Sequence, residues 1–134
     1  MNIIVFPGQG SQKIGMGKEL SENFVEAKHV FEEVNDAINF NLTKIMWEGT
    51  DDQISLTSNA QPALMACSVA VLRVLEKITN KNLPNLADYL CGHSLGEYTA
   101  MTAAGVFSLK ECAVLLKLQV FLLLLTIHPN HLSL

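Results

Sequence analysis

A serine between two glycines is the feature of this chain best suited to chemistry. Residues 92–96 read Gly-His-Ser-Leu-Gly and fit the pattern G-x-S-x-G. We predict a short strand over residues 88–92 and a helix from the motif to about Ala104, so the serine occupies a sharp strand-to-helix turn. Such a turn strains the serine backbone and directs helix amides at an oxyanion. Ser94 is therefore a candidate nucleophile, with the N–H of Leu95 as an oxyanion donor. The alternative for this motif is a plain glycine-rich turn.

A second glycine-rich loop could meet this turn. The apolar run Asn2–Phe6 predicts a buried strand, and Pro7-Gly8-Gln9-Gly10-Ser11-Gln12 follows it. In a parallel sheet both loops would lie at the carboxyl edge of the strands, where the second loop could supply another oxyanion donor. It is not a nucleotide-binding loop, because G-x-G-x-x-G needs glycine at Lys13 and a P-loop needs lysine at Met16. The alternative is a turn that binds nothing.

The elements that must position these loops are mostly helical. Apolar residues at three- and four-residue spacing predict a helix over residues 24–38, and Asn41 can cap a short helix through Trp47. A long helix over residues 59–78, with Pro62 in its first turn, is apolar almost all round and should be central to the core. Ser108 and Glu111 have the form of a capping box that starts another helix. The polar stretches 50–57 and 80–88 predict loops.

Composition excludes several classes of function. The chain has 134 residues, 49% hydrophobic and 16% charged, which suits one domain. Its net charge is -4 and Arg73 is its single arginine, so we expect no nucleic-acid or membrane-surface partner. Cys67, Cys91 and Cys112 form no C-x-x-C pair, which argues against a disulfide framework or a metal site. The apolar window 113–127 is too short to span a membrane. With no secretory signal visible, we expect a cytoplasmic protein.

Three stretches together resemble a known family. Residues 6–12, residues 57–64 with Gln61-Pro62-Ala63, and residues 92–98 look like malonyl-CoA:acyl-carrier-protein transacylase and the related acyltransferase domains of fatty acid and polyketide synthases. The resemblance covers residues 1 to about 116. It implies an α/β fold, the amino-terminal part of an α/β-hydrolase-like core, with the ferredoxin-like subdomain and the remaining sheet absent.

The resemblance also implies a site. Ser94 would carry malonyl as an ester, and the backbone N–H groups of Gln9 and Leu95 would form the oxyanion hole. Malonyl would pass from coenzyme A to Ser94 and then to the phosphopantetheine thiol of acyl carrier protein. Malonyl-CoA and acyl carrier protein are thus the expected partners, with no cofactor.

Two family residues have no counterpart. The arginine that grips the malonyl carboxylate falls on Gln119, which carries no charge, and the glycine after it falls on Val120. The general-base histidine lies beyond the matching region, and without a base Ser94 is a weak nucleophile.

Other residues could stand in for the missing groups. His93 should project away from Ser94, and His29 reads as a solvated helix residue. The histidines of 128-His-Pro-Asn-His-131 are separated by a proline that disfavours a metal pair. Glu97 is explained as well by the dipole of its helix as by a role in the site.

The end of the chain loses the family pattern. Residues 113–134 hold 9 of its 20 leucines and one formally charged residue. We therefore expect residues 1–116 to be a partial acyltransferase domain and 117–134 an aberrant, frameshifted Leu-rich tail, in a truncated chain that is inactive and poorly soluble. Two other hypotheses remain open. One is a different G-x-S-x-G esterase or thioesterase, and the other is a non-catalytic fragment that binds a carrier protein or a partner subunit.

Overall fold

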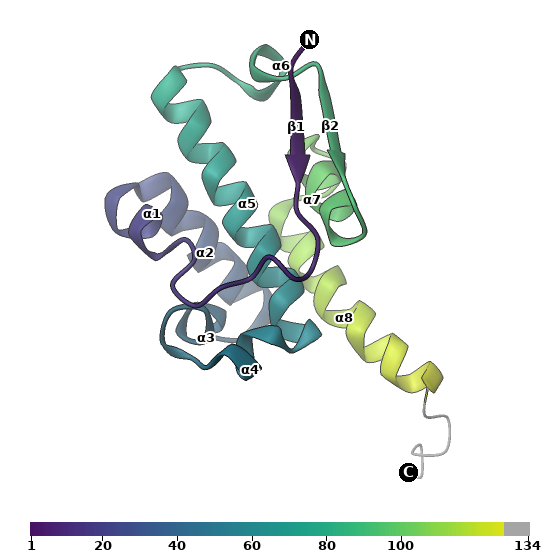
Figure 1. The fold of residues 1–134 in the computed structure, drawn as a ribbon. Coiled ribbons are helices and arrows are strands. Elements are labelled where there is room, and N and C mark those ends of the chain that lie inside the picture. Colours follow the sequence, from purple (N-terminus) through teal and green to yellow (C-terminus); the bar gives the residue numbers. More distant parts are fainter. Residues whose placement is uncertain (128–134) are drawn as a thin grey trace.

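Helices dominate the chain. The computed structural model describes residues 1–127, with side chains up to residue 119. In this part it has two strands and eight helices (Figure 1). In chain order they are β1 (Ile3–Phe6), α1 (Lys18–Asn23), α2 (Val25–Ile38), α3 (Leu42–Glu48), α4 (Asp51–Ser55), α5 (Thr57–Thr79), α6 (Leu83–Leu86), β2 (Tyr89–Gly92), α7 (Leu95–Ala103) and α8 (Leu109–Ile127).

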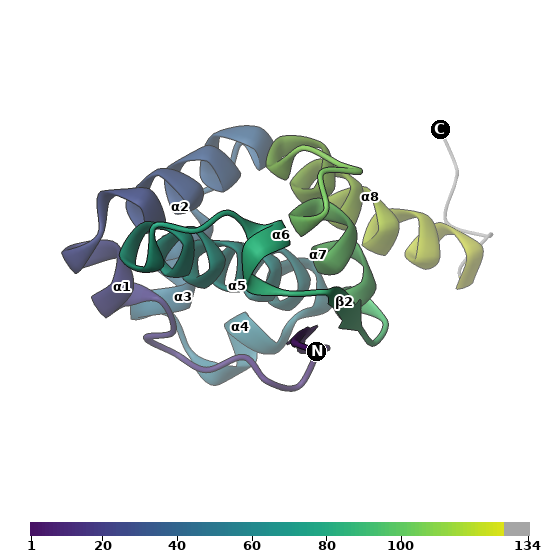
Figure 2. The same cartoon turned by 90° about the horizontal axis from the view of Figure 1, so that it is seen from above.

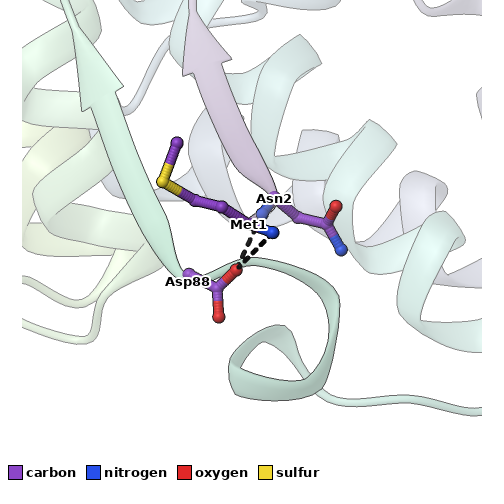
Figure 3. A network of polar contacts seen from close by, with 3 residues as sticks. All are labelled: Met1, Asn2 and Asp88. Atoms are coloured by element: carbon purple, nitrogen blue, oxygen red, sulfur yellow. Dashed lines mark hydrogen bonds and ion pairs between the residues drawn. The ribbon is translucent and has the colours of Figure 1, made fainter.

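The two strands form a parallel pair, as the sequence predicted. Ile3 lies opposite Tyr89 and Phe6 opposite Gly92, so both strands end at the same edge. Asp88 fixes the other end (Figure 3): its Oδ2 accepts the N–H of Asn2 at 2.7 Å and lies 3.9 Å from the amino-terminal ammonium group. The Asp88 N–H donates in turn to the Asn2 carbonyl at 2.9 Å. These contacts join the amino-terminal ends of the two strands.

Helix α5 is the centre of the core, as its apolar surface predicted. It packs against α2, α7 and α8, and Figure 1 shows it running through the body of the molecule. Ala63, Ala66 and Ala70 are fully buried on it, and such small side chains let neighbouring helices approach closely. Elsewhere in the core the ring of Phe31 packs edge-on against the ring of Trp47, with the ring centroids 5.6 Å apart.

Two predicted helix starts are confirmed by their caps. Asn41 Oδ1 accepts the Lys44 N–H at 3.2 Å at the start of α3. Ser108 and Glu111 exchange hydrogen bonds at the start of α8, where Ser108 N–H donates to Glu111 Oε2 at 2.8 Å and Glu111 N–H donates to Ser108 Oγ at 3.1 Å. Local side-chain chemistry therefore determined these boundaries.

The predicted loops were wrong in detail. Residues 50–57 contain helix α4, because Thr50 and Gln53 form a reciprocal capping box. Residues 80–88 contain the short helix α6, and α1 had not been predicted. Helix α5 begins at Thr57, so Pro62 lies inside the helix rather than in its first turn.

The predicted boundary at residue 116 falls inside one helix. Leu116 is fully buried, and the ammonium group of Lys117 lies over the Phe40 ring, 4.4 Å from its centroid. Helix α8 continues to Ile127. The division into a domain and a tail stays a prediction. Within the described residues no helix has the length and apolar character that crossing a membrane requires.

Candidate active site around Ser94

Ser94 lies in a strained turn between β2 and α7. Its φ of 52° and ψ of -111° place a side-chain-bearing residue in the left-handed half of backbone space, where few residues other than glycine are found. The side chain is exposed, and α7 begins at the next residue. The strand-turn-helix geometry that the motif predicted is therefore present, and strain of this kind is concentrated at functional sites.

The two glycines of the motif are required by close packing. A Cβ on Gly92 would overlap the Gly96 carbonyl group and lie 2.7 Å from the Glu97 nitrogen. A Cβ on Gly96 would overlap the Phe6 carbonyl oxygen and lie 3.2 Å from that of Pro7. Helix α7 thus rests directly on the ends of both strands, and a larger residue at either position would force the helix or the strand ends to shift.

The three sequence stretches meet at this edge of the sheet. A Cβ on Gly8 would lie 3.1 Å from the His93 carbonyl oxygen, so the first loop touches the serine turn. Gln9 Nε2 donates to Thr57 Oγ1 at 3.2 Å and joins the same loop to the start of α5. The prediction that a parallel sheet would bring the glycine-rich loop to the serine turn is confirmed.

Two backbone N–H groups at the site have no acceptor among the described residues. The amides of Gly96 and Glu97 donate to the carbonyls of His93 and Ser94, at 2.9 and 3.0 Å. Within residues 1–127, by contrast, no acceptor receives the N–H of Leu95 or of Gln9. These are the two groups that the sequence singled out as oxyanion donors.

Glu97 supports the strained turn. Its Oε1 accepts the Ser94 N–H at 3.2 Å, across the first turn of α7. This contact adds a hydrogen bond to the favourable charge of a carboxylate at a helix N-terminus. From the sequence, Glu97 could either interact with the dipole of its helix or take part in the site. The three-residue spacing from Ser94 to Glu97, which is that of a capping box, was the signal for this hydrogen bond.

The described residues bring no histidine to Ser94 as a hydrogen-bond partner. His93 is exposed, and its ring Nδ1 would lie 3.9 Å from a Cβ on Gly8, beside the first loop. His29 is exposed on α2, as predicted, and His128 and His131 lie outside the described residues. Residues 1–127 also contain no cluster of three His, Cys, Asp or Glu side chains that could bind a metal ion.

Two buried amide oxygens stand out among the polar groups. Gln119 Oε1, at the position where the resemblance expects arginine, is buried on α8 and has no hydrogen-bond partner among the described residues. The same is true of Gln61 Oε1 on α5. Val120 lies beyond the residues whose side chains the structure describes. A neutral amide at position 119 provides no positive charge for a carboxylate.

Comparison with known proteins identifies the family. The family model of the acyl transferase domain matches residues 3–121. The chain belongs to this family. Malonyl CoA-acyl carrier protein transacylase of Bacillus subtilis (strain 168) is 47% identical over 107 residues, which are 80% of this chain and 32% of that protein. The Haemophilus influenzae protein of the same name is 36% identical, over 87% of this chain and 36% of its own length.

Solved structures support the same family assignment. The acyl-carrier-protein-S-malonyltransferase of Bartonella henselae matches with a TM-score of 0.85 and 53% identity, over 89% of this chain and 38% of its own. A malonyl-transacylase in complex with a type II PKS acyl-carrier protein matches with a TM-score of 0.76 and 36% identity, over 87% of this chain and 37% of its own. The described fold is thus the amino-terminal part of the acyltransferase fold. The chain spans about a third of the length of these relatives.

Proposed function

We propose that this chain carries the nucleophile part of a malonyl-CoA:acyl-carrier-protein transacylase site. The observation that carries the proposal is the left-handed backbone of Ser94, which lies between two glycines whose close backbone contacts leave no room for a Cβ. The relatives that match this part of the chain are named as malonyl transacylases. In this proposal residues 1–116 form the amino-terminal part of an α/β-hydrolase-like core, and residues 117–134 are a separate tail.

The chemistry follows from the geometry. Ser94 Oγ attacks the thioester carbonyl of malonyl-CoA, and the negative charge that forms on the carbonyl oxygen is stabilised by the N–H groups of Leu95 and Gln9. The coenzyme A thiolate leaves, and malonyl remains as an ester on Ser94. The phosphopantetheine thiol of acyl carrier protein then attacks this ester, which transfers malonyl and regenerates the serine hydroxyl.

Two requirements of this reaction are unmet within residues 1–127. The serine proton needs a base, and no histidine is hydrogen-bonded to Ser94 in this part of the chain. The malonyl carboxylate needs a cation, and Gln119 is neutral. General-base catalysis alone contributes about 10²–10⁴-fold. We therefore expect malonyl transfer by the isolated chain to be far below that of a complete enzyme.

The experiment that tests the proposal restores the missing groups. Residues 1–118 are joined to the Bacillus subtilis relative from the residue that aligns with position 119 onward, so that the arginine and the histidine expected from the resemblance are both present. We expect the chimera to transfer radiolabelled malonyl from coenzyme A to acyl carrier protein. Ser94→Ala should abolish the transfer and the malonyl ester seen by mass spectrometry. Ser55→Ala, at an exposed serine on α4, is the matched control and should leave both unchanged.

Two results would contradict the proposal. One is a chimera with a cooperative unfolding transition that transfers no malonyl. The other is transfer that persists in Ser94→Ala. Hydrolysis of malonyl-CoA that is as fast as transfer to the carrier protein would instead favour the esterase hypothesis.

A further inference from the structure

Each of the two candidate oxyanion donors has a left-handed residue beside it. Ser94, with a φ of 52°, precedes Leu95, and Gly10, with a φ of 112°, follows Gln9. The loop after β1 and the turn after β2 lie next to each other in both views of the fold (Figure 1 and Figure 2). The Leu95 N–H belongs to the peptide plane that begins at Ser94, so the Ser94 dihedral angles orient it, and Gly10 sets the direction of the chain immediately after Gln9.

A side-chain oxygen binds the N–H of each left-handed residue. Glu97 Oε1 accepts the Ser94 N–H at 3.2 Å, and Gln12 Oε1 accepts the Gly10 N–H at 2.8 Å. In both loops the acceptor comes from a residue two or three positions further along the chain. One acceptor is a carboxylate and the other a neutral carboxamide, so the feature that the two contacts share is an oxygen acceptor rather than a charge.

In the serine turn these bonds select a single amide. The Ser94 N–H is bound by Glu97, and the N–H groups of Gly96 and Glu97 donate to backbone carbonyls. Among residues 94–97, the Leu95 N–H is the one amide that has no acceptor within the described part of the chain. The Glu97 carboxylate therefore both supports the turn and occupies the amide next to the donor.

Local hydrogen bonds have to hold both loops, because neighbouring elements do not enclose the left-handed residues. A Cβ on Gly10 would meet nothing within 4 Å, and the Ser94 side chain is exposed. Beside Gly10, the Gln9 side chain is bound by α5, since its Nε2 donates to Thr57 Oγ1 at 3.2 Å. The donor at Gln9 thus lies between two side-chain hydrogen bonds, one to α5 and one within the loop.

We propose that Glu97 and Gln12 are positioning residues for the oxyanion hole, each of which fixes one donor through the left-handed residue beside it. The inference rests on the proposed function, in which the N–H groups of Leu95 and Gln9 stabilise the oxyanion. Both side chains act through a backbone amide rather than on the substrate. Oxygen acceptors of the same length should therefore replace them, whereas alanine should not.

The first test measures malonyl transfer by the chimera of the preceding section. Loss of one oxyanion donor lowers kcat by about 10²–10³-fold, and a displaced donor loses part of this, so Glu97→Ala and Gln12→Ala should each lower kcat at least about tenfold. The KM for malonyl-CoA should stay within about twofold, because the interaction is made in the transition state. Glu97→Gln and Gln12→Glu should retain most of the activity. Glu22→Ala, at an exposed glutamate on α1, is the matched control and should leave kcat unchanged.

The second test examines the malonyl ester on Ser94 by infrared spectroscopy, with a ¹³C label in the ester carbonyl. Hydrogen bonds to a carbonyl oxygen lower its stretching frequency. The two alanine variants should therefore shift the band to higher frequency, and the two conservative variants should not. A merely structural role would lower the amount of ester without moving the band.

The third test needs no activity and uses the full 134-residue chain. Exchange of the Ser94 amide hydrogen should accelerate at least about fivefold in Glu97→Ala, and exchange of the Gly10 amide hydrogen should do the same in Gln12→Ala. Glu97→Gln and Gln12→Glu should keep most of the protection, because each retains an oxygen acceptor.

Three results would overturn the inference. They are an active chimera whose kcat neither alanine variant lowers, amide exchange that neither alanine variant accelerates, and a Glu97→Gln variant that behaves like Glu97→Ala, which would assign that contact to charge alone. The first of these results would leave the proposed function standing. An inactive chimera whose amides respond as expected would defeat the proposed function and not the positioning of the two loops.

Discussion

Replacement of Gly96 by alanine should separate the sheet from α7. The added Cβ would overlap the Phe6 carbonyl oxygen and lie 3.1 Å from the carbonyl carbon and 3.2 Å from the Pro7 oxygen. These atoms are backbone, so the end of β1 or the whole of α7 must shift. Overpacking of this kind costs about 1–3 kcal/mol, and the gain in helix propensity from glycine to alanine offsets up to about 1 kcal/mol. Because the clash is with backbone, we expect a net loss of about 2 kcal/mol.

Hydrogen exchange measures this loss at the sheet itself. A loss of about 2 kcal/mol in the opening free energy corresponds to about 30-fold faster exchange of the amides of residues 3–6 and 89–92. Gly96→Val should accelerate exchange further, because its larger side chain meets the same carbonyl. Gly105→Ala is the control: a Cβ there meets nothing within 4 Å, so its cost is confined to the left-handed backbone after α7.

The steric reasoning would be refuted by either of two results. One is unchanged exchange of the strand amides in Gly96→Ala. The other is acceleration of those amides by Gly105→Ala to the same degree as by Gly96→Ala. Urea unfolding followed by the fluorescence of Trp47, which packs in the helical core, shows whether the rest of the fold remains intact in each variant.

Two further predictions concern the helical core and α8. Phe31→Ala removes a side chain that is 2% exposed, and it should lower the free energy of unfolding by about 3–5 kcal/mol. Urea unfolding should then show a lower midpoint or no cooperative transition. An unchanged midpoint would contradict the assigned packing. The pKa of Glu111 is lowered by hydrogen bonds from the backbone N–H and then the hydroxyl of Ser108. A carboxyl with a lowered folded pKa stabilises the protein above its unfolded pKa of about 4.5, and that stability is lost as pH falls through the folded pKa. Glu111→Gln should therefore lower the urea midpoint near neutral pH and converge with the unmodified chain under acid conditions, whereas a constant difference at all pH values would count against this assignment.

Much of the fold could be predicted because its signals are local. The caps at Asn41 and Ser108 are set by side chains within three residues of the amides that they bind. The apolar runs before the two loops predicted the strands, and a parallel sheet was expected to bring those loops to one edge, as the observed pairing does. Helix α4 was not predicted, because its stretch of polar residues is typical of a loop. The spacing of Thr50 and Gln53, which is that of a capping box, already indicated a helix start.

The strand-turn-helix geometry around Ser94 was predictable from the sequence, but the contacts that hold it were not. The G-x-S-x-G pattern pointed to Ser94, yet the approach of Gly96 to Phe6 joins positions 90 residues apart in sequence and depends on how α7 lies across the strands. The Gln9–Thr57 hydrogen bond likewise requires α5 to begin at Thr57, two residues earlier than the sequence indicated. Periodicity and composition carry no information on such distances.

The contacts that position Ser94 all lie within the part of the acyltransferase fold that this chain contains. The strained backbone of Ser94 is supported by Glu97, by the two motif glycines and by the loop after β1, all within residues 6–97. None of these contacts supplies a histidine or a cation: the turn is held by amides, small residues and one carboxylate, which accepts the Ser94 N–H. The geometry of the serine turn is therefore set by this part of the fold alone, without the groups that would make the serine reactive.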